Sequence, residues 1–184
     1  MAKAKTGAFY LTEQVILTAA NTPVQGTLSL ASYVDVASKQ GIAVEAVDFM
    51  YQSKTAGAYN ADVGRVGGAT TQMTIGAQVT DVNRGVNIVS AAADRALIGS
   101  GSLHQAATGG LSHMSDLYPD NYGPVATDEA RIVVNDQLFF TAETDNGFSG
   151  TGDLAVTVRL KCRIVKLTER DFMAIAITSS AADN

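Results

Sequence analysis

The stretch LAVTVRLKCRIVKL, residues 154–167, decides the fold class. Apolar residues alternate with polar ones along its first eleven positions, which is the pattern of a β-strand with one buried face. The opposite face is cationic, because it carries Arg159, Lys161 and Arg163. After Ile164 the apolar phase moves to Val165 and Leu167, which predicts a kink at the end of the strand.

Alternation of the same kind recurs along most of the chain. It predicts further strands at residues 9–19, 27–36, 42–52, 72–80 and 131–144, with a change of apolar phase between Val44 and Val47 that indicates a bulge or a corner between two sheets. Thr168, followed by Asp171, predicts a capped helix over 168–177, and residues 91–99 favour a short helix. We expect loops at 54–68, 99–124 and 144–153. Seven to nine strands with Gly-rich turns favour an all-β sandwich or barrel.

The length of 184 residues predicts a single domain, 1–184, with flexible tails at 1–6 and 178–184. The net charge of −5 argues against specific nucleic-acid binding, although the basic tip MAKAK is a candidate for contact with an anionic surface. Because no apolar run approaches the roughly 18 residues of a membrane-spanning helix, we expect a chain that is made in the cytoplasm and does not thread a bilayer.

A catalytic site is not predicted, and neither is a cofactor. Cys162 is the only cysteine, and its place on the apolar phase of its strand predicts a small core residue rather than a reactive thiol. His104 and His113 could be combined with Asp116 as metal ligands, but their spacing matches no compact metal motif and both fall in the long 99–124 loop. Oxygen ligands for calcium are available at Asp116, Asp120 and Asn121, without the spacing of a known calcium loop.

The cationic face of residues 154–167 has two interpretations. Arg159, Lys161 and Arg163 could contact nucleic acid, but no aromatic residue is interleaved to stack on bases. The favoured interpretation is contact with acidic side chains of an adjacent strand or of a neighbouring subunit. With Tyr118 and Tyr122, which we expect to pack on a neighbour, these residues form the predicted subunit interface.

Three segments together resemble the single jelly-roll major capsid proteins of icosahedral, internal-membrane-containing viruses of archaea and thermophilic bacteria, the sphaerolipovirus-like group. The segments are LSLASYVDVASKQGIAVEAVDFMYQS (28–53), NDQLFFTAETDN (135–146) and LAVTVRLKCRIVKLTERDFMAIA (154–176). The resemblance implies a single jelly roll of about eight strands in two antiparallel sheets, followed by a short C-terminal helix.

The resemblance also implies a structural role without catalytic residues. The chain would form homo-oligomeric capsomers, or capsomers with a sister capsid protein, in a virion shell that lies over an internal viral membrane. The alternative is a carbohydrate- or receptor-binding β-sandwich. That alternative is weakened by the absence of Trp and an aromatic content of 7%, because sugar binding commonly uses exposed aromatic platforms.

Overall fold

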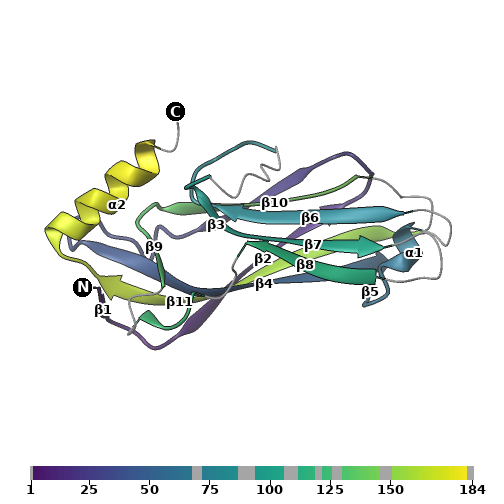
Figure 1. Cartoon of the computed structure of the whole chain (residues 1–184). Helices are drawn as coiled ribbons and strands as arrows, with labels where there is room; N and C mark the ends of the chain where they lie inside the picture. The colour runs from purple at the N-terminus through teal and green to yellow at the C-terminus, as the bar shows by residue number, and fades with distance from the viewer. Residues whose placement is uncertain are drawn as a thin grey trace.

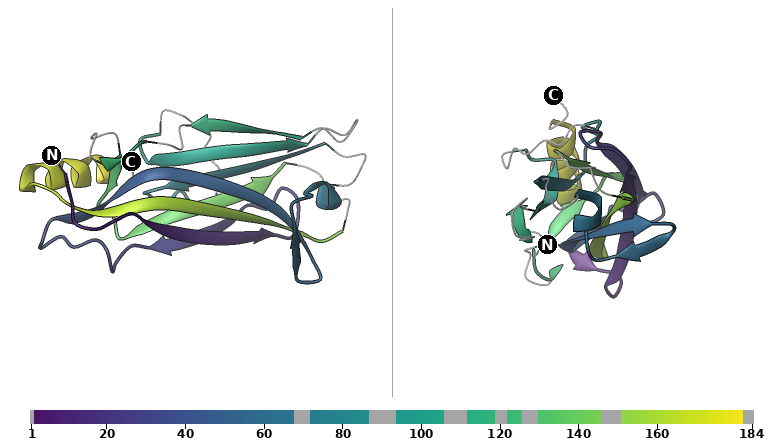
Figure 2. Two further views of the ribbon diagram at one scale, coloured as in Figure 1. Left: turned by 90° about the horizontal axis from the view of Figure 1, so that it is seen from below. Right: turned by 90° about the vertical axis from the view of Figure 1, so that its right-hand side faces the viewer.

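The computed structural model describes residues 2–67, 72–86, 94–105, 112–118, 122–125, 130–145 and 151–181. These residues form an elongated sandwich of two antiparallel sheets, with a helix at the end where the N-terminus also lies (Figures 1 and 2). Seen along its long axis, the molecule shows the two sheets as stacked layers (Figure 2, right).

The strands divide between a six-stranded sheet, here sheet A, and a five-stranded sheet, sheet B. Sheet A contains β1 (Lys3–Ala4), β2 (Phe9–Leu17), β4 (Gln40–Thr55), β5 (Ala58–Asn60), β9 (Arg131–Val133) and β11 (Asp153–Lys166). Sheet B contains β3 (Val24–Ser29), β6 (Met73–Thr80), β7 (Leu97–Gln105), β8 (Ser112–Tyr118) and β10 (Gln137–Thr144). The helices are α1 (Gly64–Gly67) and α2 (Glu169–Ala181).

The order of pairing defines the fold as a jelly roll. Eight strands pair as in a long hairpin that has been rolled up: β2 with β11, β3 with β10, β4 with β9 and β6 with β7. Rolling places successive strand pairs alternately in the two sheets. Sheet A therefore contains the order β2-β11-β4-β9, and sheet B contains the order β3-β10-β6-β7. Two antiparallel sheets wound in this way are the jelly-roll architecture. The predicted all-β jelly-roll class with a C-terminal helix is therefore confirmed.

The alternation that decided the fold class appears in β11 as two different faces. Leu154, Val156, Val158, Leu160 and Cys162 are all fully buried in the core between the sheets. Because β11 lies between β2 and β4, it is a central strand of sheet A, and both of its neighbours add apolar residues to the same core. The alternate residues lie on the opposite surface, which we call the outer face of sheet A.

The phase change at the end of β11 has its cause in helix α2. Val165 and Leu167 belong to a second apolar cluster with Phe172 of α2 and Ala43 of β4, separate from the core between the sheets. Ala43 lies between Ile42 and Val44, which face the main core, so the second cluster is on the opposite side of the sheet. Helix α2 thus covers the outer face of sheet A at one end of the sandwich.

The predicted phase change in the 42–52 strand is a β-bulge. The pairing of β4 with β11 is shifted between Lys161 and Cys162, which oppose Ala46 and Val44, and Glu45 is the extra residue. An extra residue moves the following residues of a strand to the opposite faces, which is why Val47 faces the core as Val44 does.

Several sequence-based boundaries differ from the structure. Leu97–Gly99, expected in a helix, begin strand β7, and the 99–124 loop contains the paired strands β7 and β8. Lys3 and Ala4, expected in a tail, pair with Lys166 and Val165, because the exposed edge of β11 offers free backbone groups there. Residues 178–181, expected in the other tail, extend α2, and 182–184 lie outside the described residues. The predicted cap is confirmed, because Asp171 N–H donates to Thr168 Oγ1 at 3.2 Å.

Candidate assembly surface

The predicted cationic row of β11 is divided between two environments. Lys161 and Arg163 meet a carboxylate of the same chain: Arg163 Nε donates to Glu45 Oε1 at 2.6 Å, and Lys161 Nζ lies 3.3 Å from Glu45 Oε2. The favoured interpretation, contact with acidic groups of an adjacent strand, is thereby confirmed for these two residues. Both are engaged within the subunit, and their predicted place in a subunit interface stays a prediction.

Glu45 is the centre of this cluster because the bulge of β4 presents it there. Its side chain is only 2% exposed, and Oε1 also accepts from the backbone N–H of Val125 at 3.3 Å. Burial alone would raise the pKa of Glu45, but contacts with Arg163, the Val125 N–H and Lys161 outweigh burial and hold that pKa below its ordinary value. Glu45 is therefore a buried anion that holds β4, β11 and the 122–125 segment together.

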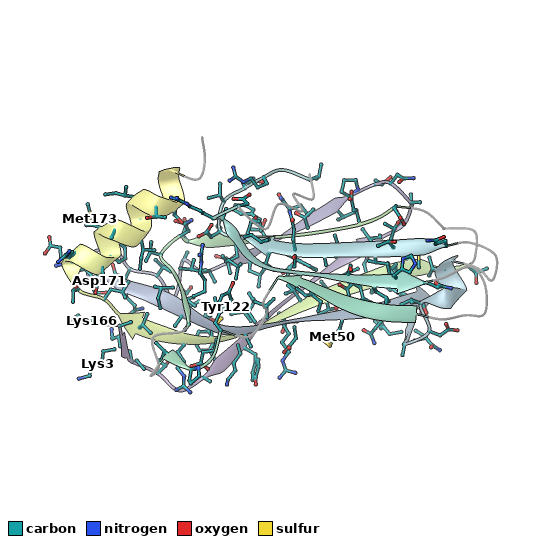
Figure 3. All side chains as sticks on the ribbon, in the orientation of Figure 1. Lys3, Met50, Tyr122, Lys166, Asp171 and Met173 are labelled. Carbon is teal, nitrogen blue, oxygen red and sulfur yellow. The ribbon has the colours of Figure 1, made fainter. Side chains whose placement is uncertain are left out.

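Tyr122, one of the two predicted interface tyrosines, belongs to the same local structure. Its backbone N–H donates to the carbonyl of Glu45 at 2.9 Å, and its hydroxyl donates to the carbonyl of Ile98 in sheet B. The ring packs against the main core and points into the sandwich (Figure 3). Tyr118 ends β8 opposite Ser100, and its side chain lies outside the described residues. Tyr122 thus serves the interior of the subunit.

Arg159 is the one member of the cationic row that remains exposed. Its guanidinium carbon lies 4.0 Å from the centre of the Tyr10 ring, a cation–π contact, and Tyr10 is itself 51% exposed. Asp48 is exposed on β4 directly opposite Arg159 in the register, yet it makes no ion pair in the described part of the chain. Arg159 therefore presents a flat cation–aromatic pair with an unpaired carboxylate beside it.

Two further large side chains extend this exposed surface along the outer face. Met50 is 41% exposed and projects away from the sandwich (Figure 3), and Tyr59 of the β4–β5 hairpin is 47% exposed. The Tyr59 hydroxyl donates to Gln14 Oε1 at 2.9 Å, which ties the hairpin to β2 across the face. We call Tyr10, Met50, Tyr59 and Arg159, with Asp48, the aromatic patch.

Sequence reasoning missed most of this patch. Tyr10 and Met50 occupy the polar phase of strands whose apolar phase faces the core, and a large apolar residue in that phase is a usable signal. Tyr59 falls in a segment predicted as a loop, and only the hairpin places it on the face. Glu45 was missed because its position depends on the bulge.

The described residues contain no cluster of His, Cys, Asp or Glu that could hold a metal ion. His104 lies directly opposite His113 in the β7–β8 pair, so the prediction that both histidines lie in a loop is wrong. His104 Nδ1 lies 2.9 Å from Thr74 Oγ1. Asp120 and Asn121 fall outside the described residues.

Burial and the nearby charge of Glu45 raise the pKa of Cys162 to about 12, which leaves the thiol protonated. No helix in the described part of the chain is long and apolar enough to cross a membrane.

The chain is thus a jelly-roll protein whose most distinctive surface is an exposed aromatic patch on one sheet. No protein-family model and no characterised protein sequence matches it. Among solved structures it is similar to a chain of Desmodium yellow mottle tymovirus, at 9% identity over 89% of this chain and 90% of that one, with a TM-score of 0.34.

It is also similar to VP1 of Trichodysplasia spinulosa-associated polyomavirus in a complex with GM1 oligosaccharide, at 10% identity over 89% of this chain and 97% of VP1, with a TM-score of 0.36. In a complex with sialylated precision glycooligomers, VP1 gives 12% identity, coverage of 89% and 98%, and a TM-score of 0.33. Similarities of this size identify no family for the chain and assign it no role.

Proposed function

We propose that the chain is a structural subunit that assembles with copies of itself into a protein shell, as a capsid protein of a virion. The observation that carries this proposal is the aromatic patch. Protein interfaces are enriched in Tyr, Met and Arg, which are the residue types gathered at Tyr10, Met50, Tyr59 and Arg159. A monomer gains nothing from exposing them together on a flat sheet, whereas a neighbouring copy would bury them.

The patch is also suited to contact between identical subunits. Arg159 and Asp48 lie side by side on neighbouring strands, and the structure gives Asp48 no ion pair of its own within the described residues. Across a two-fold axis the same surface meets itself, so Arg159 of each copy can pair with Asp48 of the other. The charges therefore favour self-association.

The edge of the sandwich supports contact through this face. Glu13 of edge strand β2 is on the inward-facing phase, opposite Val158, and Gly26 leaves room for it because a Cβ at Gly26 would lie 2.9 Å from Glu13 Oε1. Partial burial raises the pKa of Glu13, so the position is costly for a carboxylate. Inward-pointing charge on an edge strand opposes edge-to-edge pairing between molecules. We therefore infer that copies meet through the patch and not by continuing the sheets.

A narrower form of the proposal rests on the resemblance of residues 28–53, 135–146 and 154–176 to single jelly-roll major capsid proteins. The chain would then be a major capsid protein of an archaeal or bacterial virus with an internal membrane. It would be made in the host cytoplasm and would form capsomers with itself or with a sister capsid protein. Contact with the internal membrane belongs to this narrower form.

Size-exclusion chromatography with light scattering, followed by electron microscopy, tests the proposal on the purified chain over a range of salt and protein concentrations. We expect capsomer-sized or shell-like particles. Arg159→Glu should leave monomers with an unchanged circular dichroism spectrum. Its melting temperature should fall by no more than about 2–4 °C, since the change removes only the exposed contact with Tyr10 and places a second carboxylate opposite Asp48. Arg170→Glu, the same charge change on exposed α2, is the matched control and should assemble normally.

A wild-type chain that stays monomeric under all these conditions would contradict self-assembly, and normal assembly of Arg159→Glu would remove the patch from the interface. The alternative function, a carbohydrate- or receptor-binding module, would use the exposed rings of Tyr10 and Tyr59. A monomer that binds glycans saturably, and loses them in Tyr10→Ser, would favour that alternative.

A further inference from the structure

The end of the sandwich that carries α2 combines exposed cations with exposed apolar side chains. Figure 3 places Lys3, Lys166 and Met173 at this end of the molecule. Ala2 packs against the same apolar cluster as Phe172 of α2, which holds the N-terminal segment beside the helix. The basic tip of the sequence therefore lies at the α2 end, away from the aromatic patch.

Three large apolar side chains are exposed at this end: Val36 at 70%, Met173 at 55% and Ile177 at 62%. Met173 and Ile177 are four residues apart, so they lie on one side of α2. Val36 belongs to a loop that is held beside the start of α2, because the Leu167 N–H donates to the carbonyl of Lys39 at 2.9 Å. Exposed apolar side chains gathered outside the aromatic patch indicate a second contact surface.

The acidic groups of the α2 end have roles within the subunit. Glu169 pairs with Lys39 at 2.8 Å, and Asp35 accepts from Ser38 Oγ at 2.6 Å in its own turn. Asp171 lies in the first turn of α2, where the helix dipole favours a carboxylate.

Three cations of the α2 end have no ion pair among the described residues: Lys3, Lys166 and Arg170. Lys3 and Lys166 are both exposed and lie directly opposite each other in the β1–β11 pair, where like charges repel. Arg170 comes three residues before Met173, so it lies on the same side of α2 as the exposed apolar side chains. An anionic partner outside the subunit would relieve the repulsion and neutralise these cations.

The charge changes sign along the molecule. Strand β11 runs from Asp153 at the α1 end to Lys166 at the α2 end (Figure 1). The described charged side chains at the α1 end are mainly acidic: Asp62, Glu143, Asp145 and Asp153, against Lys54. An elongated molecule with this asymmetry can present its cationic end to an anionic surface although its net charge is −5.

We propose that the α2 end binds the surface of an anionic lipid bilayer. The three cations would lie among the headgroups, and the three exposed apolar side chains would reach the boundary with the acyl chains. Cations alone would also suit a nucleic acid. Val36, Met173 and Ile177 favour lipid, because they have no ring to stack on bases and gain from burial in an apolar layer.

The proposal deepens the narrower form of the proposed function, on which it rests only for the source of the membrane. The α2 end and the aromatic patch share no residue, so the two proposals fail separately. A chain that assembles but ignores anionic vesicles would overturn the membrane proposal and leave assembly standing. Vesicle binding by a chain that stays monomeric under all conditions would do the reverse.

Co-sedimentation with extruded vesicles tests the proposal on the full chain, as wild type and with Arg159→Glu, which keeps the subunits apart. Vesicles of phosphatidylcholine and phosphatidylglycerol in equal parts are the probe, and phosphatidylcholine alone is the control. We expect saturable binding to the anionic vesicles that weakens as salt is added, and binding to the neutral vesicles that is weaker by about tenfold or more. No binding to the anionic vesicles, or equal binding to the neutral ones, overturns the proposal.

Variants in the Arg159→Glu chain locate the contact. Lys3→Gln with Lys166→Gln should weaken binding by about 25-fold, since each cation near an anionic surface contributes about fivefold. Met173→Ser with Ile177→Ser leaves the charge unchanged and should weaken binding by about tenfold or more. Lys54→Gln removes a cation at the α1 end and, as the matched control, should bind normally.

Two results would overturn the assignment of the α2 end. One is unchanged vesicle binding in either double variant while circular dichroism shows both to be folded. The other is tighter binding to duplex DNA than to the anionic vesicles, lost in Lys3→Gln with Lys166→Gln, which would assign the cations to nucleic acid.

Discussion

Replacing Glu45 tests whether one buried carboxylate holds the centre of sheet A together. Glu45→Ala leaves Arg163 and Lys161 without their anion and leaves the Val125 N–H without an acceptor. Breaking a fully buried ion pair costs about 3–5 kcal/mol. Because the side chains of Arg163 and Lys161 keep 30% and 39% exposure, water can reach them. We therefore expect the free energy of unfolding to fall by about 2–3 kcal/mol, which includes about 1 kcal/mol for the unpaired N–H.

The assay is thermal and urea unfolding followed by circular dichroism at pH 7. For a chain of this size, each kcal/mol lowers the melting temperature by about 2–4 °C, so Glu45→Ala should melt about 4–12 °C lower. Glu45→Gln keeps an oxygen for the Val125 N–H and should lose about 1 kcal/mol less. Asp48→Ala, an exposed carboxylate on the same strand, should change stability by less than about 0.5 kcal/mol. A Glu45→Ala variant as stable as Asp48→Ala would refute the reasoning.

The dependence on pH gives a second readout of the same carboxylate. The folded-state pKa of Glu45 lies below its ordinary value of 4.5, so the ionised form is stabilised by folding. This contribution is present at pH values above the unfolded pKa and disappears as the pH falls through the folded pKa. The stability difference between wild type and Glu45→Gln should therefore shrink as the pH is lowered from 6 through 4.5 and below. A difference that stays constant over this range would show that the charge of Glu45 contributes nothing.

Three further predictions concern the thiol, the helix cap and the core. Cys162 is fully buried, and burial and Glu45 raise its pKa to about 12. We therefore expect no reaction with Ellman's reagent in the folded chain and full reaction in denaturant. Rapid labelling of the folded chain would contradict the burial of this thiol. Thr168→Ala removes the cap of α2 and should cost about 1 kcal/mol in urea unfolding, against no measurable change for Thr178→Ala near the other end of the helix. Phe140→Ala should cost about 3–5 kcal/mol, because this fully buried ring packs against Phe49; a loss below about 1 kcal/mol would mean that the sheets are not packed as described.

The sandwich could be predicted from sequence because strand faces repeat every two residues wherever one face is buried. Long alternating segments such as Phe9–Leu17 and Asp153–Lys166 follow this rule, and the structure has strands there. The 99–124 segment could not be predicted, because its glycines are equally typical of turns. Gly99 is instead a close-packing position: a Cβ there would lie 3.2 Å from Cγ1 of Val47 in the opposite sheet. Glycine in a strand interior can mark such a close approach, but the sequence alone does not show which residue approaches it.

The site was harder to predict than the fold for a related reason. Periodicity assigns Arg159, Lys161 and Arg163 to one face, but it does not say which carboxylate each cation meets. Glu45 reaches Arg163 because the extra residue in β4 changes the phase of that strand between Val44 and Val47. The row of cations therefore separates into an internal part and an exposed part.

The two phase changes in the chain look alike in sequence and have different physical causes. In β4 an inserted residue shifts the register, so the strand continues against the same core with its faces exchanged. In β11 the covering layer changes: up to Cys162 the apolar side faces sheet B, and from Val165 onward the other side is covered by α2. The residues after each phase change distinguish the two cases. A helix begins directly after β11, and its apolar residue Phe172 buries the new phase, whereas β4 continues as a strand for several residues beyond its bulge. A phase change at the end of a strand, directly before a helix with apolar residues, thus favours a helix folded onto the opposite face over a bulge.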